Sequence, residues 1–378
     1  MSHVTTERSI TRLDAWQVRI PLATPYRLSK VYGTLTHSNA VLVRVSLSGG
    51  VEGWGEADPG GRSFTGDTAE EVMTAFRERA PAMIGVSVED WVVDGRGRDS
   101  SGSLAAAIDV ACHDALARAR SEPVWRLLGE KLRDSIDVLW PTSSGTADAD
   151  LALIGNYRAR GFRTFMLKMG ERSIEDELVR VHAVLKGMPT DAAVMVDANQ
   201  GWTLDEALAF ADGTAGLPLI LIEQPVAAGD LNGLHQVRQR ASCPVSVDES
   251  LQKPGDVGDI IKAGAASVFS IKISKNGGLA NASYIASAAR DAGMRVLMNS
   301  MIELGITQAA SLHLGCTLDN LMDCGHAYMS TLRMADDVTD FSSWVADGTA
   351  TLSDRPGLGV EVFPGKVDQY TVDTFHVS

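Results

Sequence analysis

The chain has 378 residues, of which 45% are hydrophobic and 22% are charged, and its formal net charge at pH 7 is −14. This balance is typical of a globular protein and excludes a disordered chain. The acidic residues are scattered along the sequence, whereas binding to nucleic acid requires clustered lysines and arginines. We therefore expect no nucleic-acid partner, and the length predicts either two cores or one barrel with an accessory domain.

Cysteines and apolar segments bear on the cellular compartment. The four cysteines show no CxxC pairing, so we expect buried free thiols. The first residues contain no apolar leader segment, and no stretch approaches about 18 unbroken apolar residues. These features predict a cytoplasmic protein with no membrane partner.

The first part of the chain, residues 1–130, combines strands and helices. Three β-type segments precede two helical ones, and a short glycine-containing link between the second and third segments is typical of a hairpin. The expected elements are the strands Ile10–Ile20, Ala40–Leu47 and Val51–Ala57, and the helices Thr68–Ala82 and Leu104–Ala119. Residues 1–130 are thus predicted to form an α+β domain.

From residue 131 to about 340, short apolar segments alternate with amphipathic helical segments. The expected strands are Ile136–Trp140, Thr164–Lys168, Ala193–Asp197, Leu219–Glu223, Pro244–Asp248, Val268–Lys272, Arg295–Met298 and Asn320–Asp323. Eight strands alternating with helices every 25–30 residues are typical of a (β/α)8-barrel. Residues 341–378, with β-type segments such as Thr349–Leu352, are predicted to return to the first domain as a C-terminal tail that completes it.

Five consecutive barrel strands end in ionisable residues, namely Lys168, Asp197, Glu223, Asp248 and Lys272. In a barrel the C-terminal end of each strand faces the catalytic mouth. A single Asp at such a position is usually a helix N-cap. Three carboxylates in register between two lysines are hard to explain in that way, so we interpret these five residues as one site.

Three carboxylates without His or Cys indicate a hard cation bound by oxygen atoms. Mg²⁺ fits best, with one ion per subunit and Mn²⁺ able to substitute, because it keeps positions open for water and substrate. A structural calcium site is the alternative, but EF-hand spacing is absent. Asp197, Glu223 and Asp248 are therefore the candidate metal ligands.

Lys168 and Lys272 lie one strand before and one strand after the carboxylates. Around a closed barrel this spacing places them on opposite sides of a substrate held at the ion. Such amines can exchange a proton at the carbon next to a carboxylate, while the metal stabilises the resulting enediolate. The alternative is that each lysine is an ordinary salt-bridged residue.

These motifs carry a resemblance to a known group of enzymes. The stretches Met166–Gly170, Val196–Asn199, Ile222–Pro225, Val247–Ser250 and Ile271–Gly278 match, as do Gly53–Glu56, Pro123–Gly129 and Pro356–Gly359 outside the barrel. The chain resembles the enolase superfamily, in its muconate lactonizing enzyme and mandelate racemase-like group, over nearly its whole length. The resemblance implies an isomerase or lyase, with Lys168 and Lys272 as the acid/base pair and with Asn199 and Glu249 supporting the metal ligands or the lysines from behind. The usual Lys-x-Lys of the second strand is absent, because Met166 replaces its first lysine.

The resemblance also implies which residues contact the substrate. Loops of the first domain are expected to close over the mouth, and the seventh and eighth strands to add polar groups. The candidates are Tyr26, Arg27, Ser29, Glu56, Asn299, Ser300, Glu303 and Asp323. Dipeptide epimerases carry Asp-x-Asp at the eighth strand, whereas this chain has Asp323 followed by Gly325.

The predicted activity is Mg²⁺-dependent removal of a proton next to a carboxylate, in a chain that forms a homo-oligomer. The small-molecule substrate is expected to be an amino-acid-derived acid of the N-acyl amino acid, dipeptide or hydroxyproline type, which is racemised, epimerised or dehydrated. A muconate-type cycloisomerase is the alternative, and a Schiff-base aldolase barrel is a more distant one. A non-catalytic binding barrel would have little reason to keep this set of charges.

Overall fold

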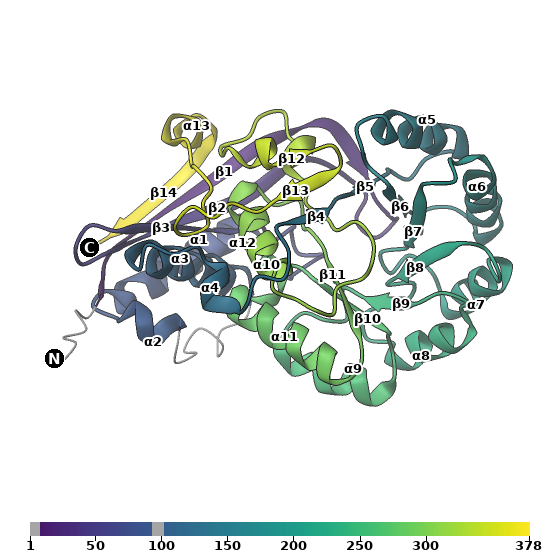
Figure 1. Ribbon diagram of the computed structural model, residues 1–378. Coiled ribbons are helices and arrows are strands. Elements are labelled where there is room, and N and C mark those ends of the chain that lie inside the picture. The colour runs from purple at the N-terminus through teal and green to yellow at the C-terminus, as the bar shows by residue number, and fades with distance from the viewer. Residues whose placement is uncertain (1–7, 93–101) are drawn as a thin grey trace.

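The computed structural model describes residues 8–92 and 102–378. The N-terminal stretch 1–7, where we expected no leader segment, lies outside the described residues. An antiparallel sheet with its helices lies against one side of a barrel of parallel strands ringed by helices (Figure 1). This is the predicted (β/α)-barrel with an N-terminal α+β capping domain.

The capping domain is built on a four-stranded antiparallel sheet with the order β14-β1-β2-β3. Its elements are β1 (Ile10–Arg27), β2 (Thr34–Leu47), β3 (Glu52–Ala57), α1 (Ala69–Arg79), α2 (Val88–Val92), α3 (Ser103–Ala119) and α4 (Trp125–Leu128). β1 and β2 run further than predicted, to Arg27 and from Thr34. This extension carries the turn at residues 28–33 onto the mouth of the barrel.

Two glycines of β3 explain how α3 packs on the sheet. A Cβ atom on Gly55 would lie 1.9 Å from the carbonyl oxygen of Ala107, and one on Gly53 would lie 2.2 Å from the backbone nitrogen of Ala115. Only glycine permits this close approach of a strand to a helix. The contact fixes the direction of β3 and thereby places Glu56 at its end toward the barrel.

The barrel contains a seven-stranded parallel sheet with the order β11-β10-β9-β8-β7-β6-β5. Its strands are β5 (Leu139–Pro141), β6 (Thr164–Lys168), β7 (Ala193–Asp197), β8 (Leu219–Glu223), β9 (Val245–Val247), β10 (Val268–Ile271) and β11 (Arg295–Met298). Its helices are α5 (Ala147–Arg158), α6 (Ile174–Gly187), α7 (Leu204–Gly213), α8 (Leu231–Arg240), α9 (Val257–Ala263), α10 (Ile273–Asn276), α11 (Leu279–Asp291) and α12 (Gly305–Gly315). Side chains such as Thr203 cap the helices that follow the strands by accepting hydrogen bonds from backbone N–H groups.

The eighth strand predicted at Asn320–Asp323 does not form as a regular strand. Leu321 makes an isolated bridge to Val296 of β11, and His326 makes one to Val138 beside β5. The segment between these bridges is irregular, and it closes the barrel through two single bridges. The ring is therefore complete, but its last strand is irregular.

The C-terminal tail divides between the two parts of the molecule. β14 (Thr371–Val377) pairs antiparallel with β1 and completes the capping sheet, as predicted. The prediction for Thr349–Leu352 was wrong, because β13 (Thr349–Thr351) pairs with β12 (Val345–Ala346) and with β4 (Ser135–Asp137) at the entrance to the barrel strands. The short helix α13 (Pro364–Tyr370) connects these two regions.

The two parts share a continuous buried interface. Glu56 at the end of β3 is fully buried and accepts hydrogen bonds from the backbone N–H groups of Leu304 (2.6 Å) and Thr307 (2.9 Å) at the start of α12. Asp114 of α3 accepts a hydrogen bond from the backbone N–H of Leu358 in the C-terminal tail, and it also accepts one from Trp54 within the capping domain. These contacts hold the capping domain in one position on the barrel.

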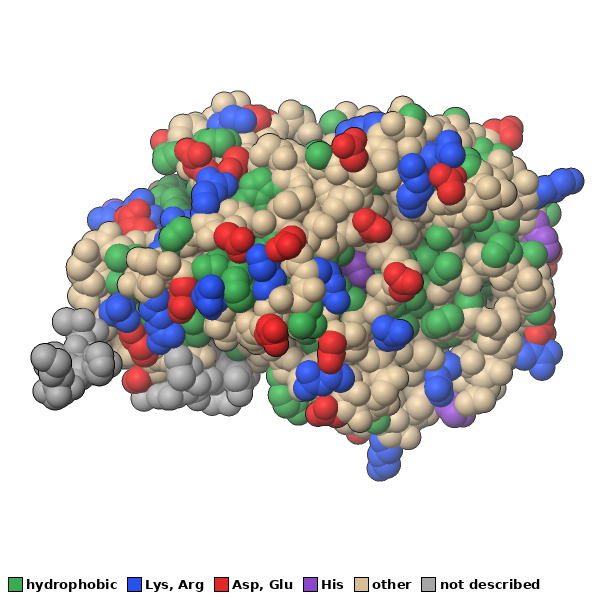
Figure 2. Space-filling view, viewed as in Figure 1, with side chains coloured by type: hydrophobic (Ala, Val, Ile, Leu, Met, Phe, Trp, Pro, Cys, Tyr) green, Lys and Arg blue, Asp and Glu red, His purple; other side chains and the backbone are tan. Residues whose placement is uncertain are grey.

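The surface and the cysteines give less information about function. On the face drawn in Figure 2, acidic and basic side chains are interspersed. The four cysteines are free, and Cys112 and Cys316 are buried. Within residues 8–92 and 102–378, no helix is both long and apolar enough to cross a membrane.

Candidate active site

The ionisable strand ends lie side by side at the mouth of the barrel. The ladder pairs Lys168 with Asp197 and Asp197 with Glu223, so three consecutive strand ends are direct neighbours. Asp248 and Lys272 directly follow β9 and β10 in the same sheet. All five residues are at least 92% buried, and a buried charge requires a partner.

Each predicted acid/base lysine faces an aspartate. Lys168 pairs with Asp197, and Lys272 pairs with Asp248 at 2.6 Å. Burial by itself would lower the pKa of Lys168 and of Lys272, but Asp197 and Asp248 respectively raise each pKa above its usual value. The lysines are thus held as cations as long as these carboxylates are free to pair with them.

Glu223 lies between the two aspartates, and its two carboxyl oxygens differ in their hydrogen bonding. Its Oε1 accepts a hydrogen bond of 2.8 Å from Asn299 Nδ2, whereas its Oε2 is buried and has no hydrogen-bond partner among the described residues. Burial, and then repulsion from Asp197 and Asp248, raise the pKa of Glu223 well above its usual value. Such crowding of carboxylates indicates a site for a cation.

The polar residues behind this row carry similar unsatisfied oxygens. Asn199 Nδ2 donates to Glu249 Oε1 (3.3 Å), while Asn199 Oδ1 and Glu249 Oε2 are buried and find no hydrogen-bond partner in the part of the chain that the structure describes. Burial and repulsion from Asp248 raise the pKa of Glu249 to about 7. These atoms and Glu223 Oε2 are acceptors and lack donors, so an oxygen-binding cation suits the donor set.

The three candidate ligands do not converge as a finished metal cluster in this arrangement. Over residues 8–92 and 102–378, no three Asp, Glu, His or Cys side chains are grouped to hold an ion. Lys168 and Lys272 take up oxygens of Asp197 and Asp248 instead. An ion at Glu223 would therefore compete for these oxygens with Lys168 and Lys272, and with Lys275, which donates to Asp248 Oδ1.

Two loops of the capping domain cover the mouth. In the first, Ser29 donates a hydrogen bond to the carbonyl of Asn199, and the hydroxyl of Tyr32 donates to Glu249 Oε1 at 2.9 Å. In the second, Phe64 stacks on Tyr32 with ring centroids 3.7 Å apart. The two loops thus contact each other through the stacked rings, and the first is hydrogen-bonded to the residues behind the carboxylates. Such contacts are expected of a cover that excludes water.

Beneath these loops lies a small pocket that both lysines line, together with Asn199, Asn299 and Ser300. A larger cavity of about 570 Å³ opens beside it toward the capping sheet, and Leu35, Met301 and Ile302 border both. Ile302 has a φ of +89°, which is strained for a β-branched residue. Strained backbone of this kind concentrates at functional sites.

The structure places the predicted substrate contacts in three groups. Tyr26, Asn299 and Ser300 line the pocket, and Ser29 lies behind it. Glu303 is buried behind Ser300, from whose hydroxyl it accepts a hydrogen bond.

The other three predicted contacts do not line this pocket. Glu56 caps α12 and does not line the pocket. Arg27 points away and pairs with Glu171, with 58% of its side chain exposed. Asp323 is exposed in the bulge of the eighth strand, near the end where β6 and its neighbours begin.

Sequence reasoning also missed residues that belong to the site. Lys275 is buried and donates to Asp248 Oδ1 at 2.6 Å, so Asp248 is shared between two lysines. Its position in the sequence, three residues after Lys272 and in the single turn of α10, could have indicated that Lys275 lies close to Lys272. Met329 lines the pocket from the irregular last strand, for which the sequence carried no periodic signal.

Two family models match the chain. Residues 10–129 match the Mandelate racemase / muconate lactonizing enzyme N-terminal domain, and residues 150–366 match the Enolase C-terminal domain-like family.

Similar proteins and structures agree with these matches. Muconate cycloisomerase 1 of Rhodococcus opacus is 30% identical over 97% of this chain and 99% of its own, and the L-Ala-D/L-Glu epimerase of Bacillus subtilis is 29% identical over 93% and 96%. The crystal structure of N-succinyl Arg/Lys racemase from Bacillus cereus superposes with a TM-score of 0.91 at 26% identity, covering 98% of this chain and 100% of the other. The chain therefore belongs to the mandelate racemase/muconate lactonizing enzyme family of the enolase superfamily, and it is an enzyme of the isomerase or lyase kind.

Proposed function

We propose that the protein removes and returns a proton at the carbon next to a substrate carboxylate, with Mg²⁺ bound by Asp197, Glu223 and Asp248. The observation that supports this is the placement of Lys168 and Lys272 on strands β6 and β10 of one pocket, with the carboxylate row between them. The unpartnered oxygen of Glu223 supports the cation. When bound, Mg²⁺ supplies positive charge that stabilises the oxygens of the substrate carboxylate.

The chain's own residues then move the proton. One lysine, as the neutral amine, takes the α-proton, and the electron pair of the C–H bond becomes the C=C bond of an enediolate. The other lysine, as the ammonium, donates a proton to the same carbon from the opposite face. The net result is racemisation or epimerisation, and each lysine has exchanged its protonation state.

Dehydration begins with the same removal of the α-proton, but a proton is then delivered to a leaving group and not to the α-carbon. A lysine that delivers the proton to a hydroxyl on the neighbouring carbon releases water and leaves a C=C bond in the product. We propose an amino-acid-derived acid as the substrate for either outcome, of the N-acyl amino acid, dipeptide or hydroxyproline type. The relatives named as an L-Ala-D/L-Glu epimerase and an N-succinyl-L-Arg/Lys racemase support this class.

A muconate-type cycloisomerase is the second candidate, because muconate cycloisomerases are among the relatives. It would act on a diacid and form a lactone without a racemisation product. A Schiff-base aldolase is a more distant candidate, and covalent trapping by borohydride would identify it.

The metal can be tested by binding and by turnover together. Calorimetry should detect Mg²⁺ binding to the wild type, with a loss of at least tenfold in affinity for Glu223→Gln and none for Asp205→Asn, which alters an exposed carboxylate at the start of α7. Deuterium uptake at the α-carbon in D₂O should stop on chelation and return with Mg²⁺. Full exchange after exhaustive chelation would contradict the proposal.

A further inference from the structure

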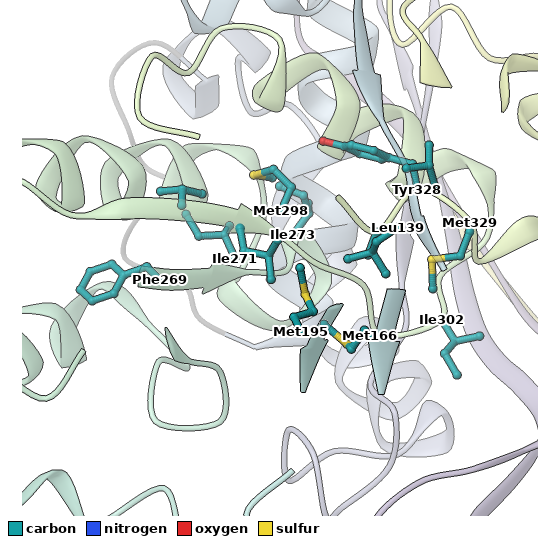
Figure 3. Close-up of a cluster of buried hydrophobic side chains, with 14 of the residues drawn as sticks. Leu139, Met166, Met195, Phe269, Ile271, Ile273, Met298, Ile302, Tyr328 and Met329 are labelled. Carbon is teal, nitrogen blue, oxygen red and sulfur yellow. The ribbon is translucent and has the colours of Figure 1, made fainter. Parts of the chain in front are cut away.

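The wall of the pocket is mostly apolar. Its nonpolar residues include Leu28, Phe64, Leu139, Met166, Ile302 and Met329, which come from both capping loops and from both ends of the barrel sheet. Figure 3 shows Leu139 and Met166 next to Met195, with Ile302 and Met329 on the same side of the barrel. Burial of an apolar group against such a wall is favourable by about 25 cal/mol per Å².

The charged groups of the pocket are already engaged. Of the described residues that line it, Lys168 and Lys272 carry charge, and they face Asp197 and Asp248 at the reacting end. Arg333 contacts two residues of the pocket, but its guanidinium stacks 3.9 Å from the centre of the Tyr26 ring and donates to the carbonyl of Pro141. It lies behind Tyr26 and does not line the pocket.

Met166 lies in the apolar wall close to Lys168, the proposed acid/base residue. It is 1% exposed, its strand neighbour Lys168 lies two residues on, and its side chain contributes to the apolar wall. A substrate carboxylate or ammonium placed against this wall would lose its hydration without gaining a partner of opposite charge. The wall therefore discriminates against charged substituents.

We propose that the substrate carries a single carboxylate and that its remaining body is uncharged and apolar, such as an aromatic or long aliphatic side chain. This inference rests on the proposed function and narrows its substrate class. It also argues against an activity on diacids, because the described residues that line the pocket offer a second carboxylate no cation apart from the two lysines at the reacting end.

A matched series of acids tests the proposal. N-acetyl-L-methionine, -phenylalanine, -glutamine, -glutamate and -lysine share one reacting end and differ in the side chain. In D₂O with Mg²⁺, the methionine and phenylalanine compounds should exchange the α-proton at least tenfold faster than the glutamate and lysine compounds, with glutamine in between. Calorimetry of the methionine and glutamate compounds should give the same order of affinity.

The exchange rates of the five compounds test the apolar side chain and the proton-transfer chemistry separately. Exchange of the glutamate or lysine compound at a rate equal to or above that of methionine would overturn the apolar assignment and leave the proton-transfer chemistry intact. Absence of exchange for all five would contradict the proposed N-acyl amino acid chemistry and, with it, this inference.

A variant of the wall adds an independent check. Met166→Lys should raise the glutamate-to-methionine rate ratio at least tenfold, whereas Met166→Leu should keep the wild-type order. Val179→Lys, which adds the same charge at a position of α6 that is 71% exposed, should leave the ratio unchanged. If circular dichroism shows that Met166→Lys does not fold, the wild-type series decides the question alone.

Discussion

Glu56 offers a quantitative test of how the two parts of the molecule are joined. Its buried carboxyl group accepts hydrogen bonds from the N–H groups of Leu304 and Thr307, two residues that are themselves at most 1% exposed. Glu56→Ala leaves both donors unsatisfied in a dry interface. Each unsatisfied buried donor costs about 1–3 kcal/mol, so the variant should lose about 2–6 kcal/mol of unfolding free energy. Glu56→Gln keeps one acceptor and should lose about half as much.

The assay is urea unfolding at pH 7, followed by tryptophan fluorescence and by circular dichroism. Glu52→Ala is the matched control, because Glu52 lies on the same strand, is 45% exposed and pairs with Arg44 at 3.4 Å. An exposed ion pair contributes about 0–1 kcal/mol. If Glu56→Ala falls within 1 kcal/mol of this control, the contact does not join the domains as we describe.

Two further predictions concern packing and pH. Gly55→Ala places a Cβ atom 1.9 Å from the carbonyl oxygen of Ala107, so the variant should lose at least about 3 kcal/mol of unfolding free energy or fail to fold. A Gly55→Ala variant that unfolds in urea at the same concentration as the wild type would refute the close contact. Burial lowers the pKa of His313 to about 4, so in acid the unfolded chain binds a proton that the folded protein does not. The contribution of His313 is complete above pH 6.5 and is lost as pH falls toward 4, by up to about 3 kcal/mol. His313→Gln should therefore show a shallower loss of stability between pH 6.5 and 4, and an unchanged slope would contradict this.

Much of the barrel could be predicted from the sequence because its strands are short apolar segments buried on both sides. β6, β7, β8 and β11 begin and end at the predicted residues. β6, β7 and β8 each lie between two other strands, and β11 pairs with β10, so the same parallel hydrogen bonding and packing recur along the sheet. The same regularity brought Lys168, Asp197 and Glu223 into register.

The prediction failed where the chain departs from that regularity. The eighth strand is a bulge held by single bridges at Leu321 and His326, so Asp323 lies outside the mouth although its place in the sequence suggested the opposite. Ile136 belongs to β4 and pairs with Ala350 of the tail. Such partners, distant in sequence, leave no periodic signal in either segment.

The role of Glu56 could not be predicted because it depends on a contact between the two domains. Its position beside a glycine-rich strand end suggested a loop over the substrate, but the backbone N–H groups at the start of α12 lie within its reach. A helix N-terminus attracts a carboxylate whatever the surrounding function. Sequence alone does not show which helix of the barrel meets the capping domain at that point.

The central claim is that Lys168 and Lys272 exchange protons on opposite faces of one carbon. Its direct measurement is deuterium exchange at the α-carbon in D₂O, followed by NMR for each enantiomer of an accepted acid. For a racemisation, Lys168→Ala should abolish exchange from one enantiomer and Lys272→Ala from the other, with both variants folded by circular dichroism and inactive in overall turnover. For a dehydration, one variant should lose all activity and the other should keep slower turnover. Exchange at the wild-type rate in the double variant would show that neither lysine is the base and would contradict the account.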